Sequence, residues 1–360
     1  MTIDASALAS PTCPAPATES DRITLVHGAG TGASARLFEQ VLLPRLRSAP
    51  LEERHDGAVL TLPGGDRLAF TTDSYVVSPL EFPGGDIGSL AVHGTVNDLA
   101  MCGARPLALS CALVLEEGLP LAILHRVLDS MAAAARAAGV SIVTGDTKVV
   151  ERGKGDGLFV NTAGVGLVAA GRDLRPARVR AGDRIVVSGD LARHGVAVLS
   201  QREGLAFETE IVSDSAPLAA LADAVCAAAP NLHCLRDPTR GGLGAVLHEI
   251  AAAAGVEIEI EEARLPFEPA VNAACELLGL DPVFLASEGR CVAFVAPADE
   301  AAVLAAMRAR DDGAGAVTVG EVVTPAAGRQ AVAGRVVVRT RIGGRRLLER
   351  PTGEPLPRIC

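Results

Sequence analysis

The chain ends in a cysteine, Cys360, which places a thiol on the free end of the polymer. Gly353 and three prolines precede it, Pro351, Pro355 and Pro357. This composition favours an extended, solvated segment over a packed element. An exposed thiol is open to oxidation, so its presence suggests a use, namely a nucleophile that accepts a group at one place and carries it to another. An accidental thiol on a frayed terminus is the alternative.

A set of aspartates at predicted strand ends and helix-embedded turns forms a second candidate group: Asp73, Asp98, Asp146 and Asp237. Any one of them alone is most simply a solvated surface charge. Together they suggest a Mg²⁺ site, because Mg²⁺ takes oxygen ligands and is commonly held by a few carboxylates and substrate phosphates. Glu288, between small residues and just before an apolar stretch, is a candidate general base.

Two polar residues share one face of a predicted helix over Ser89–Met101. His93 and Asn97 are four residues apart among apolar neighbours, and Asp98 follows directly. A histidine in such a position is often only a satisfied core residue. With Asn97 and Asp98 beside it, a functional role for His93 is favoured.

Lysine usage singles out one basic residue. Of 33 basic residues only Lys148 and Lys154 are lysines, so a lysine in this arginine-rich chain argues against free exchange with arginine at its position. Lys148 lies in the segment Gly-Asp-Thr-Lys at 145–148 and is interpreted as chemically required, whereas Lys154 lies in a glycine-rich loop and is interpreted as incidental.

Two glycine-rich stretches are candidate phosphate sites. The first, at 27–32, resembles a phosphate-wrapping loop but lacks the Gly-Lys-Ser/Thr ending of a Walker A motif, and a flexible linker is its alternative. The second, Arg-Asp-Pro-Thr-Arg-Gly-Gly at 236–242, leads into an amphipathic helix. There Thr239 is the predicted N-cap, and the glycines permit close approach of phosphate to the helix start.

Composition excludes several classes of function. The 360 residues are 49% hydrophobic and only 2% aromatic, and the net charge is −10. Scarce stacking platforms and a negative balance argue against nucleic acid as the main partner. No signal sequence or apolar run of membrane-spanning length is present, so no membrane partner is expected. The eight cysteines form no Cys-x-x-Cys pair, and we expect a reducing cytoplasm.

The elements that must position these residues alternate without a regular βαβ rhythm or short repeat, which predicts an α+β fold. Strands are expected at 58–62, 67–72, 107–115, 140–144, 158–168, 184–187, 256–260, 291–295, 316–322 and 336–340. Helices are expected at 89–101, 121–138, 191–201, 217–229, 241–254 and 301–310. An Arg-rich stretch over 171–182 is the predicted domain joint, and residues 1–21 are a predicted disordered leader.

The chain resembles the HypE family of hydrogenase maturation proteins, in the PurM-like ATP-binding superfamily, from about Ile23 to Cys360. The resemblance rests on the motifs at 27–30, 72–74, 96–104, 145–149, 236–242 and 357–360. The segments Asn-Asp and Asp-Pro-Thr-Arg-Gly-Gly are typical of the superfamily, and the terminal Pro-Arg-Ile-Cys is typical of HypE. The family usually carries a further glycine where this chain has Thr31.

The resemblance implies a two-domain PurM-like subunit: a leader at 1–21, an ATP-binding and dimerisation domain at 22–171, a second α+β domain at 172–345 and a flexible tail at 346–360. It implies ATP and Mg²⁺ as cofactors and a homodimer with ATP near the subunit boundary. The implied partners are the carbamoyltransferase HypF and a HypC–HypD complex that accepts cyanide.

The implied reaction is ATP-dependent dehydration of an S-carboxamide on Cys360 to an S-cyanide, which supplies cyanide for the iron of nickel–iron hydrogenase. By this resemblance Lys148, His93 and Glu288 act in catalysis, with Glu288 the favoured base. The implied metal ligands are Asp73, Asp98, Asp146 and Asp237. The implied nucleotide-binding residues are Gly28, Gly30, Asn97, Asp146, Thr147, Thr239, Gly241 and Gly242.

Two alternatives stay open at this level. One is another PurM-like enzyme, of the selenide water dikinase or thiamine-phosphate kinase type, which acts on a free small molecule and needs no terminal thiol. The other is a non-catalytic carrier that shuttles a sulfur-bound group or a metal on its tail. The carrier hypothesis leaves the acidic residues unexplained.

Overall fold

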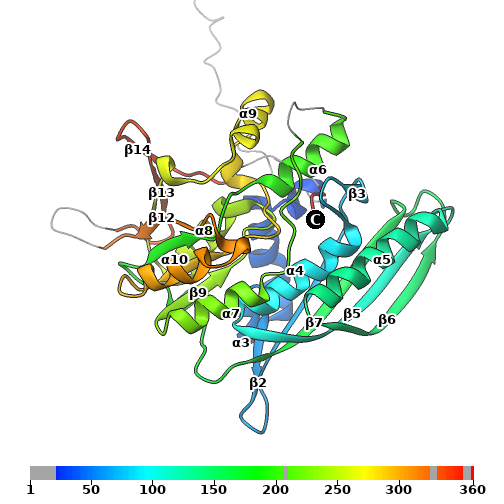
Figure 1. The fold of residues 1–360 in the computed structure, drawn as a ribbon, viewed down its shortest axis with the longest axis horizontal. Coiled ribbons are helices and arrows are strands. Elements are labelled where there is room, and N and C mark those ends of the chain that lie inside the picture. Colours follow the sequence, from blue (N-terminus) through cyan, green and yellow to red (C-terminus); the bar gives the residue numbers. More distant parts are fainter. Residues whose placement is uncertain (1–21, 206–209, 325–330, 352–357) are drawn as a thin grey trace, which may run out of the picture.

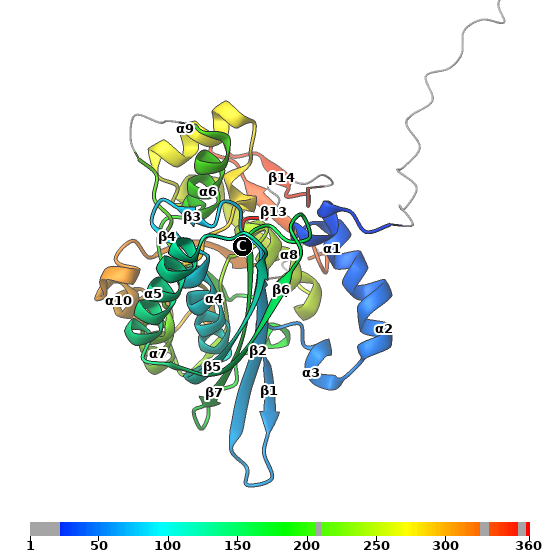
Figure 2. The same ribbon diagram turned by 90° about the vertical axis from the view of Figure 1, so that its right-hand side faces the viewer.

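The computed structural model describes residues 22–205, 210–324, 331–351 and 358–360. Two mixed sheets with helices packed on them form a two-domain α+β fold, as the sequence predicted (Figures 1 and 2). In the sequence, the strands of the first sheet precede the predicted joint at 171–182 and the strands of the second sheet follow it. The predicted leader at 1–21 lies outside the described residues.

The first sheet has the strand order β1-β2-β7-β5-β6. Adjacent strands in this sheet pair antiparallel, except β5 and β6, which pair in parallel. This leaves β6 on one edge of the sheet. The strands are β1 (Ala58–Thr61), β2 (Arg67–Tyr75), β5 (Ala104–Glu116), β6 (Ser141–Val150) and β7 (Leu158–Val168).

Two helices cover one face of this sheet, α4 (Ile87–Met101) and α5 (Leu121–Ala137). Asp86 caps α4, because its Oδ1 accepts the backbone N–H groups of Gly88 and Ser89. Helix α4 is buried nearly all round, as its apolar composition predicts, and lies against both domains.

The second sheet has the strand order β14-β13-β10-β12-β8-β11-β9. Only β10 and β13 pair in parallel among its described strands. The strands are β8 (Arg184–Val187), β9 (Leu232–Arg236), β10 (Ile258–Glu261), β11 (Val292–Val295), β12 (Val317–Val322), β13 (Val336–Arg339) and β14 (Arg345–Leu347).

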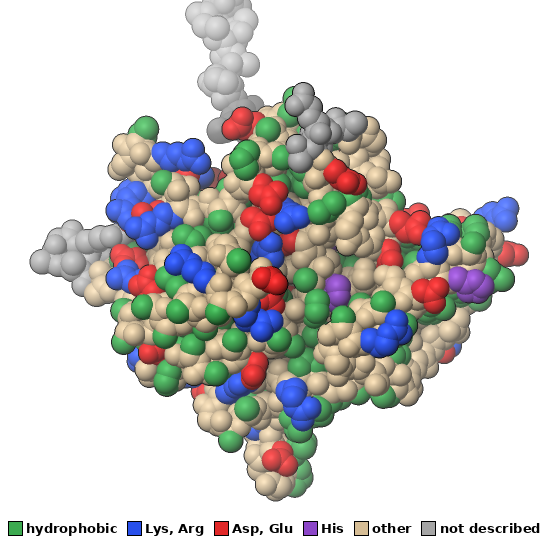
Figure 3. All heavy atoms as spheres, in the orientation of Figure 1, with side chains coloured by type: hydrophobic (Ala, Val, Ile, Leu, Met, Phe, Trp, Pro, Cys, Tyr) green, Lys and Arg blue, Asp and Glu red, His purple; other side chains and the backbone are tan. Residues whose placement is uncertain are grey.

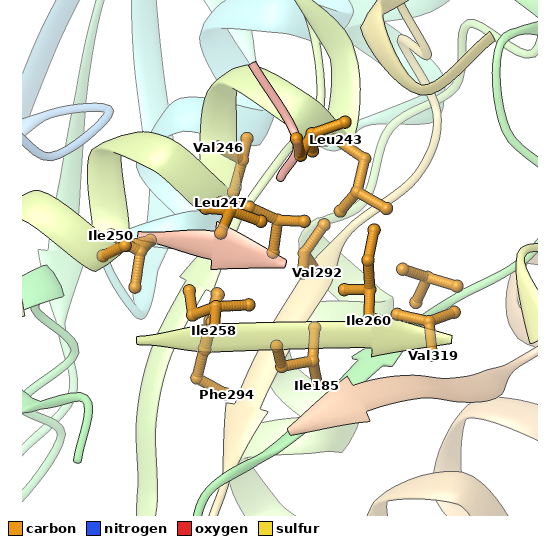
Figure 4. Packing of buried hydrophobic residues seen from close by; sticks show 14 of the residues in the cluster. Ile185, Leu243, Val246, Leu247, Ile250, Ile258, Ile260, Val292, Phe294 and Val319 are labelled. Atoms are coloured by element: carbon orange, nitrogen blue, oxygen red, sulfur yellow. The ribbon is translucent and has the colours of Figure 1, made fainter. Parts of the chain in front are cut away.

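Helices sandwich the second sheet. On one face, α8 (Gly242–Ala254) packs Leu243, Leu247 and Ile250 onto strand residues such as Phe294 (Figure 4). Each such fully buried side chain stabilises the fold by ~1.5–3 kcal/mol through lost apolar surface. On the other face lie α7 (Ala219–Ala228) and α10 (Glu300–Arg308).

The end of α4 joins the two domains. Ala100 and Met101 are fully buried in the same cluster as Leu221 of α7 and Val295 of β11. Side chains on the neighbouring turn of α4 are therefore held at the boundary between the two sheets.

Several elements were not predicted from the sequence. Short helical segments precede the first sheet, a small hairpin precedes α4, and α9 follows β10. They are η2 (Leu25–Gly28), α1 (Gly32–Arg36), η3 (Leu37–Leu42), α2 (Leu43–Leu46), α3 (Ala49–Glu52), β3 (Glu81–Phe82), β4 (Gly85–Asp86) and α9 (Pro269–Leu278), and the strands β9 and β14 were missed as well. The helix predicted at 191–201 is α6 (Arg193–Glu203).

The predicted flexible tail at 346–360 needs correction at both ends. Arg346 and Leu347 belong to β14, and Leu348 is buried. At the other end Ile359 is only 5% exposed. The C-terminus lies beside α6 and the β3–β4 hairpin in both ribbon views (Figures 1 and 2), so the last residues are packed rather than solvated.

Acidic and basic side chains are interspersed on the face drawn in Figure 3, despite the net charge of −10. Among the described helices, none combines the length and the apolar character needed to cross a membrane.

Candidate active site

Three carboxylates from distant parts of the chain meet at the domain boundary. Asp56 precedes β1, Asp98 lies on α4, and Asp237 follows β9. One oxygen from each lies within 4.8 Å of the others. Three hard oxygen donors this close are a ligand set typical of Mg²⁺.

The burial of these carboxylates fits a bound cation. Asp237 is 3% exposed, and its Oδ2 has no hydrogen-bond partner among the described residues. Burial raises the pKa of Asp98 well above its usual range, and the charges of Asp237 and Asp56 add to this. Clustered buried carboxylates are costly unless a positive charge neutralises them, so the residues fit a divalent metal ion.

Asp73 and Glu288 lie next to the trio. Asp73 is close enough for its charge to raise the pKa of both Asp98 and Asp237, but the trio does not include it. Burial raises the pKa of Glu288 well above its usual range, and the charge of Asp237 adds to it. The Oε1 of Glu288 is buried with no hydrogen-bond partner in the described part of the chain. A carboxyl group of raised pKa that faces the site unpaired is suited to proton transfer.

Asn97, predicted as a nucleotide-binding residue, bridges several backbone segments. Its Nδ2 donates to the carbonyls of Ala216 and Glu288, and its Oδ1 accepts the N–H of Leu218. The side chain is 0% exposed. Because these backbone groups occupy its amide, Asn97 positions the segment that carries Glu288.

The two glycine-rich stretches lie against each other. A Cβ on Gly30 would be 2.8 Å from the carbonyl oxygen of Arg240, and one on Gly241 would be 2.9 Å from the carbonyl oxygen of Gly30. Both glycines have positive φ, 70° and 82°. A side chain at either position would meet the opposing backbone, so this contact between Gly30 and Gly241 depends on glycine.

Thr31, the departure from the family pattern, caps helix α1. Its Oγ1 accepts the N–H of Ala33 and donates to the carbonyl of Val26. Thr239, by contrast, does not cap α8. The N-cap is Gly241, and the left-handed backbone of Gly241 and Gly242 delays the start of the helix beyond Thr239.

Cys360 lines a cavity of about 470 Å³. Residues of the first glycine-rich stretch, the second stretch and the tail line it together, namely Gly28, Ala29, Arg240, Arg358, Ile359 and Cys360. The charge of Arg240 acts on both Asp73 and Cys360. The terminal thiol therefore lies beside the acidic cluster.

Backbone hydrogen bonds attach the tail to the first domain. The N–H of Val76 donates to the carbonyl of Cys360 at 3.1 Å, and the N–H of Ser78 donates to the carbonyl of Arg358 at 3.3 Å. Burial raises the pKa of the Cys360 thiol to about 12, although the charge of Arg240 acts in the opposite sense. The docked thiol is therefore protonated at neutral pH.

Three predicted site residues lie elsewhere in the subunit. Asp146, Thr147 and Lys148 are exposed on β6, a strand that runs to Val150 rather than ending at Thr144 as predicted. Lys148 Nζ donates to both carboxylate oxygens of Asp146, at 2.7 and 2.6 Å. The described subunit does not bring Asp146 into the carboxylate trio.

His93 lies at the domain boundary, where its Nδ1 is 3.0 Å from the hydroxyl oxygen of Ser215. Burial lowers the pKa of His93 to about 4. The ring is therefore neutral at pH 7, able to accept or to relay a proton.

Sequence reasoning missed two contributors, Asp56 and Arg240. Asp56 precedes a strand and is followed by glycine. Other candidate aspartates also border small residues, so this pattern was the signal that could have identified Asp56. Its Oδ1 is 2.5 Å from Arg236 Nε, so the pair crosses the domain boundary. Arg240 lies within the glycine-rich motif at 236–242, but its place beside the Cys360 thiol depends on the fold.

Comparisons with known proteins agree along nearly the whole chain. Residues 54–168 match the family described as AIR synthase related protein, N-terminal domain, and residues 180–330 match its C-terminal domain. The chain is 52% identical over 342 residues to the carbamoyl dehydratase HypE of Cupriavidus necator, covering 95% of this chain and 96% of that protein.

Two solved structures are similar in fold and sequence. A HypE–HypF complex matches with a TM-score of 0.82 and 42% identity, over 88% of this chain and 99% of the other. A hydrogenase maturation protein HypE in complex with ATP matches with a TM-score of 0.79 and 45% identity, over 94% and 100% of the two chains.

Proposed function

Because the chain belongs to the HypE carbamoyl dehydratases, enzymes of nickel–iron hydrogenase maturation, we propose that it converts an S-carboxamide on its own Cys360 into an S-cyanide at the expense of ATP. The single observation that carries this proposal is the placement of the terminal thiol in a cavity shared with both glycine-rich stretches and next to Glu288.

ATP supplies the energy by phosphorylating the amide oxygen. That oxygen attacks the γ-phosphorus, the bond from the γ-phosphorus to the bridging oxygen breaks, and ADP leaves as one N–H proton is lost. Loss of the second N–H proton and departure of inorganic phosphate then leave the nitrile on sulfur. The oxygen of the carboxamide ends on phosphate, so the net change is loss of one water.

Asp56, Asp98 and Asp237 would hold Mg²⁺, with Asp73 beside them. The metal ion would neutralise phosphate charge when bound. The relative that binds ATP supports a nucleotide site here, and we place the phosphates near Gly28, Gly30 and the 239–242 turn.

Glu288 is our candidate for the base that removes the amide protons. Its unpaired Oε1 and its raised pKa, which burial causes, suit a carboxylate that accepts a proton more readily than an exposed one. His93 is a second candidate for proton transfer, since it is neutral.

Loading of Cys360 requires the tail to undock. A buried thiol with a pKa of about 12 is a weak nucleophile, since the thiolate is the reactive form. We infer that a carbamoyltransferase loads the thiol in the undocked state. A relative solved as a HypE–HypF complex supports HypF as that partner, and a HypC–HypD complex is the proposed acceptor of the cyanide.

We propose that β6 contacts a second copy of the chain. It is an edge strand with exposed apolar side chains, among them Val143 at 66% and Val149 at 67%. Such an edge invites pairing unless it is covered. A homodimer formed there would also bring Asp146, Thr147 and Lys148 to the subunit boundary, where Lys148 could neutralise phosphate.

A reducing cytoplasm is the proposed location, because the carrier must stay a thiol. Each of the seven cysteines in the described part of the chain is free.

Intact mass spectrometry tests the proposed function. Protein carbamoylated on Cys360 should lose the mass of one water from its C-terminal peptide when Mg-ATP is added. An unchanged mass would contradict the dehydration. The rival PurM-like enzyme, which acts on a free small molecule, predicts full activity of Cys360→Ser on a soluble substrate. The carrier hypothesis predicts no ATP turnover by the carbamoylated protein.

A further inference from the structure

The docked tail lies between the two domains, and helix α6 of the second domain supplies side-chain hydrogen bonds to it. The first domain offers the backbone N–H groups of Val76 and Ser78. From α6, His194 Nε2 lies 2.9 Å from the carbonyl oxygen of Ile359, and Arg202 Nη2 donates to the carbonyl of Arg358 at 2.7 Å. Two successive carbonyls of the tail are thus bound by one helix.

The surroundings of His194 fix its tautomer. A carbonyl oxygen only accepts, so Nε2 carries the hydrogen and donates to Ile359. Nδ1 then accepts from the hydroxyl of Ser213 at 2.8 Å, and the same hydroxyl oxygen accepts the N–H of Ser215. His194 is 0% exposed and packs edge-on against Phe82, with ring centroids 5.3 Å apart. It is a neutral, immobilised donor aimed at the residue before the thiol.

The start of α6 is also tied to the segment that carries Glu288. The N–H of Ala192 donates to Ser287 Oγ at 2.8 Å, and the N–H of Gly195 donates to the carbonyl of Ala286 at 3.0 Å. His194 therefore bonds the tail from a helix turn whose backbone is anchored to residues 286 and 287. This geometry sets the distance from the carrier sulfur to the proposed base.

We propose that His194 and Arg202 are positioning residues, which hold the loaded tail of Cys360 in register with Glu288 during dehydration. The inference rests on the proposed function for its catalytic consequence, whereas docking itself is testable without catalysis. A single hydrogen bond of this kind changes a docking equilibrium by ~3- to 10-fold.

Alkylation of Cys360 by iodoacetamide, quantified on the C-terminal peptide by mass spectrometry without ATP, measures the undocked population. His194→Ala and Arg202→Met should each raise the undocked population and so speed alkylation, by up to ~3- to 10-fold where the docked state predominates. Both should also slow single-turnover dehydration of carbamoylated protein, because less of the loaded tail is held in register. His194→Gln keeps an N–H donor near the position of Nε2 and should restore both rates, which a merely structural role would not predict. His125→Gln, on the exposed side of α5, is the matched control.

Parental alkylation rates in folded His194→Ala and Arg202→Met would overturn the proposal, with folding checked by thermal melting. A His194→Gln protein that behaves like His194→Ala would overturn the hydrogen-bond role of His194. If the parent and the His125→Gln control fail to lose water, the proposed function fails, while the alkylation rates still decide whether α6 docks the tail.

Discussion

The carboxylate trio makes a specific prediction for Asp237→Asn. Asp237 is buried, its Oδ2 has no partner among the described residues, and burial together with the charge of Asp56 raises its pKa. The asparagine side chain has the same shape but no negative charge. Loss of that charge should relieve the repulsion between buried carboxylates in the metal-free protein and weaken the binding of a cation. Without Mg²⁺ the variant should therefore melt at or above the temperature of the parent, and with Mg²⁺ it should gain much less stability.

The size of the effect follows from ligand linkage. A cation at 100 times its dissociation constant stabilises the native state by about 2.7 kcal/mol. An unfolding entropy of ~2.1 cal/mol/K per residue over 360 residues turns this into a rise in melting temperature of about 3 to 4 °C, if the subunit unfolds as one unit. Loss of one of three charged ligands should remove more than half of that rise.

Differential scanning calorimetry over a Mg²⁺ titration at pH 7 measures both quantities. Asp129→Asn, an exposed aspartate on α5, is the matched control and should keep the full parental rise. The assignment of the trio as a metal site is wrong if Asp237→Asn keeps that rise. It is equally wrong if Mg²⁺ leaves the melting temperature of the parent unchanged.

Three further predictions address the proposed base, the proposed dimer contact and the loss of stability at acid pH. Glu288→Gln should slow dehydration of carbamoylated protein by ~10²- to 10⁴-fold in the mass assay, whereas Glu276→Gln on the exposed face of α9 should not. Val149→Glu should halve the molar mass seen by light scattering after size exclusion; an unchanged mass would exclude β6 as the dimer contact. Burial lowers the pKa of His194 to about 4. The free energy of unfolding that the neutral ring contributes above pH 6.5 is therefore lost as the pH falls toward 4. Thermal melts against pH should show this loss reduced by up to about 3 kcal/mol in His194→Gln.

Much of the fold was predictable from hydrophobic periodicity. Strand 184–187 and the strand at 158–168 have the predicted bounds, and the ends of α5 and α8 differ by one residue. The segments α1, η3 and α2 follow one another without a gap over 32–46 and were missed because a proline at 44 favours a helix break. The strand β6 was cut short because Gly145 and Asp146 read as a turn, whereas pairing with β5 keeps them extended.

The site was predictable by residue type more than by role. The structure brings Asp98 and Asp237 together with Asp56, and Glu288 lies beside them. The predicted N-cap at Thr239 was wrong, because the turn that moves the cap to Gly241 arises from tertiary contacts. The backbone partners of the Asn97 amide were likewise not predictable, since they come from segments distant in the sequence.

The docking of the tail reconciles two opposing demands on one sulfur atom. In the proposed reaction an activated imidate needs a site that excludes water, whereas loading of the thiol needs exposure to a partner. At least five hydrogen bonds hold residues 358–360, each worth ~0.5–1.5 kcal/mol, and burial of Ile359 adds ~2 kcal/mol. Ordering the backbone of three residues costs ~1–2 kcal/mol each, and their side chains add to that cost. Since these opposing sums are of similar size, docking is a reversible equilibrium, and one donor such as His194 is enough to shift it.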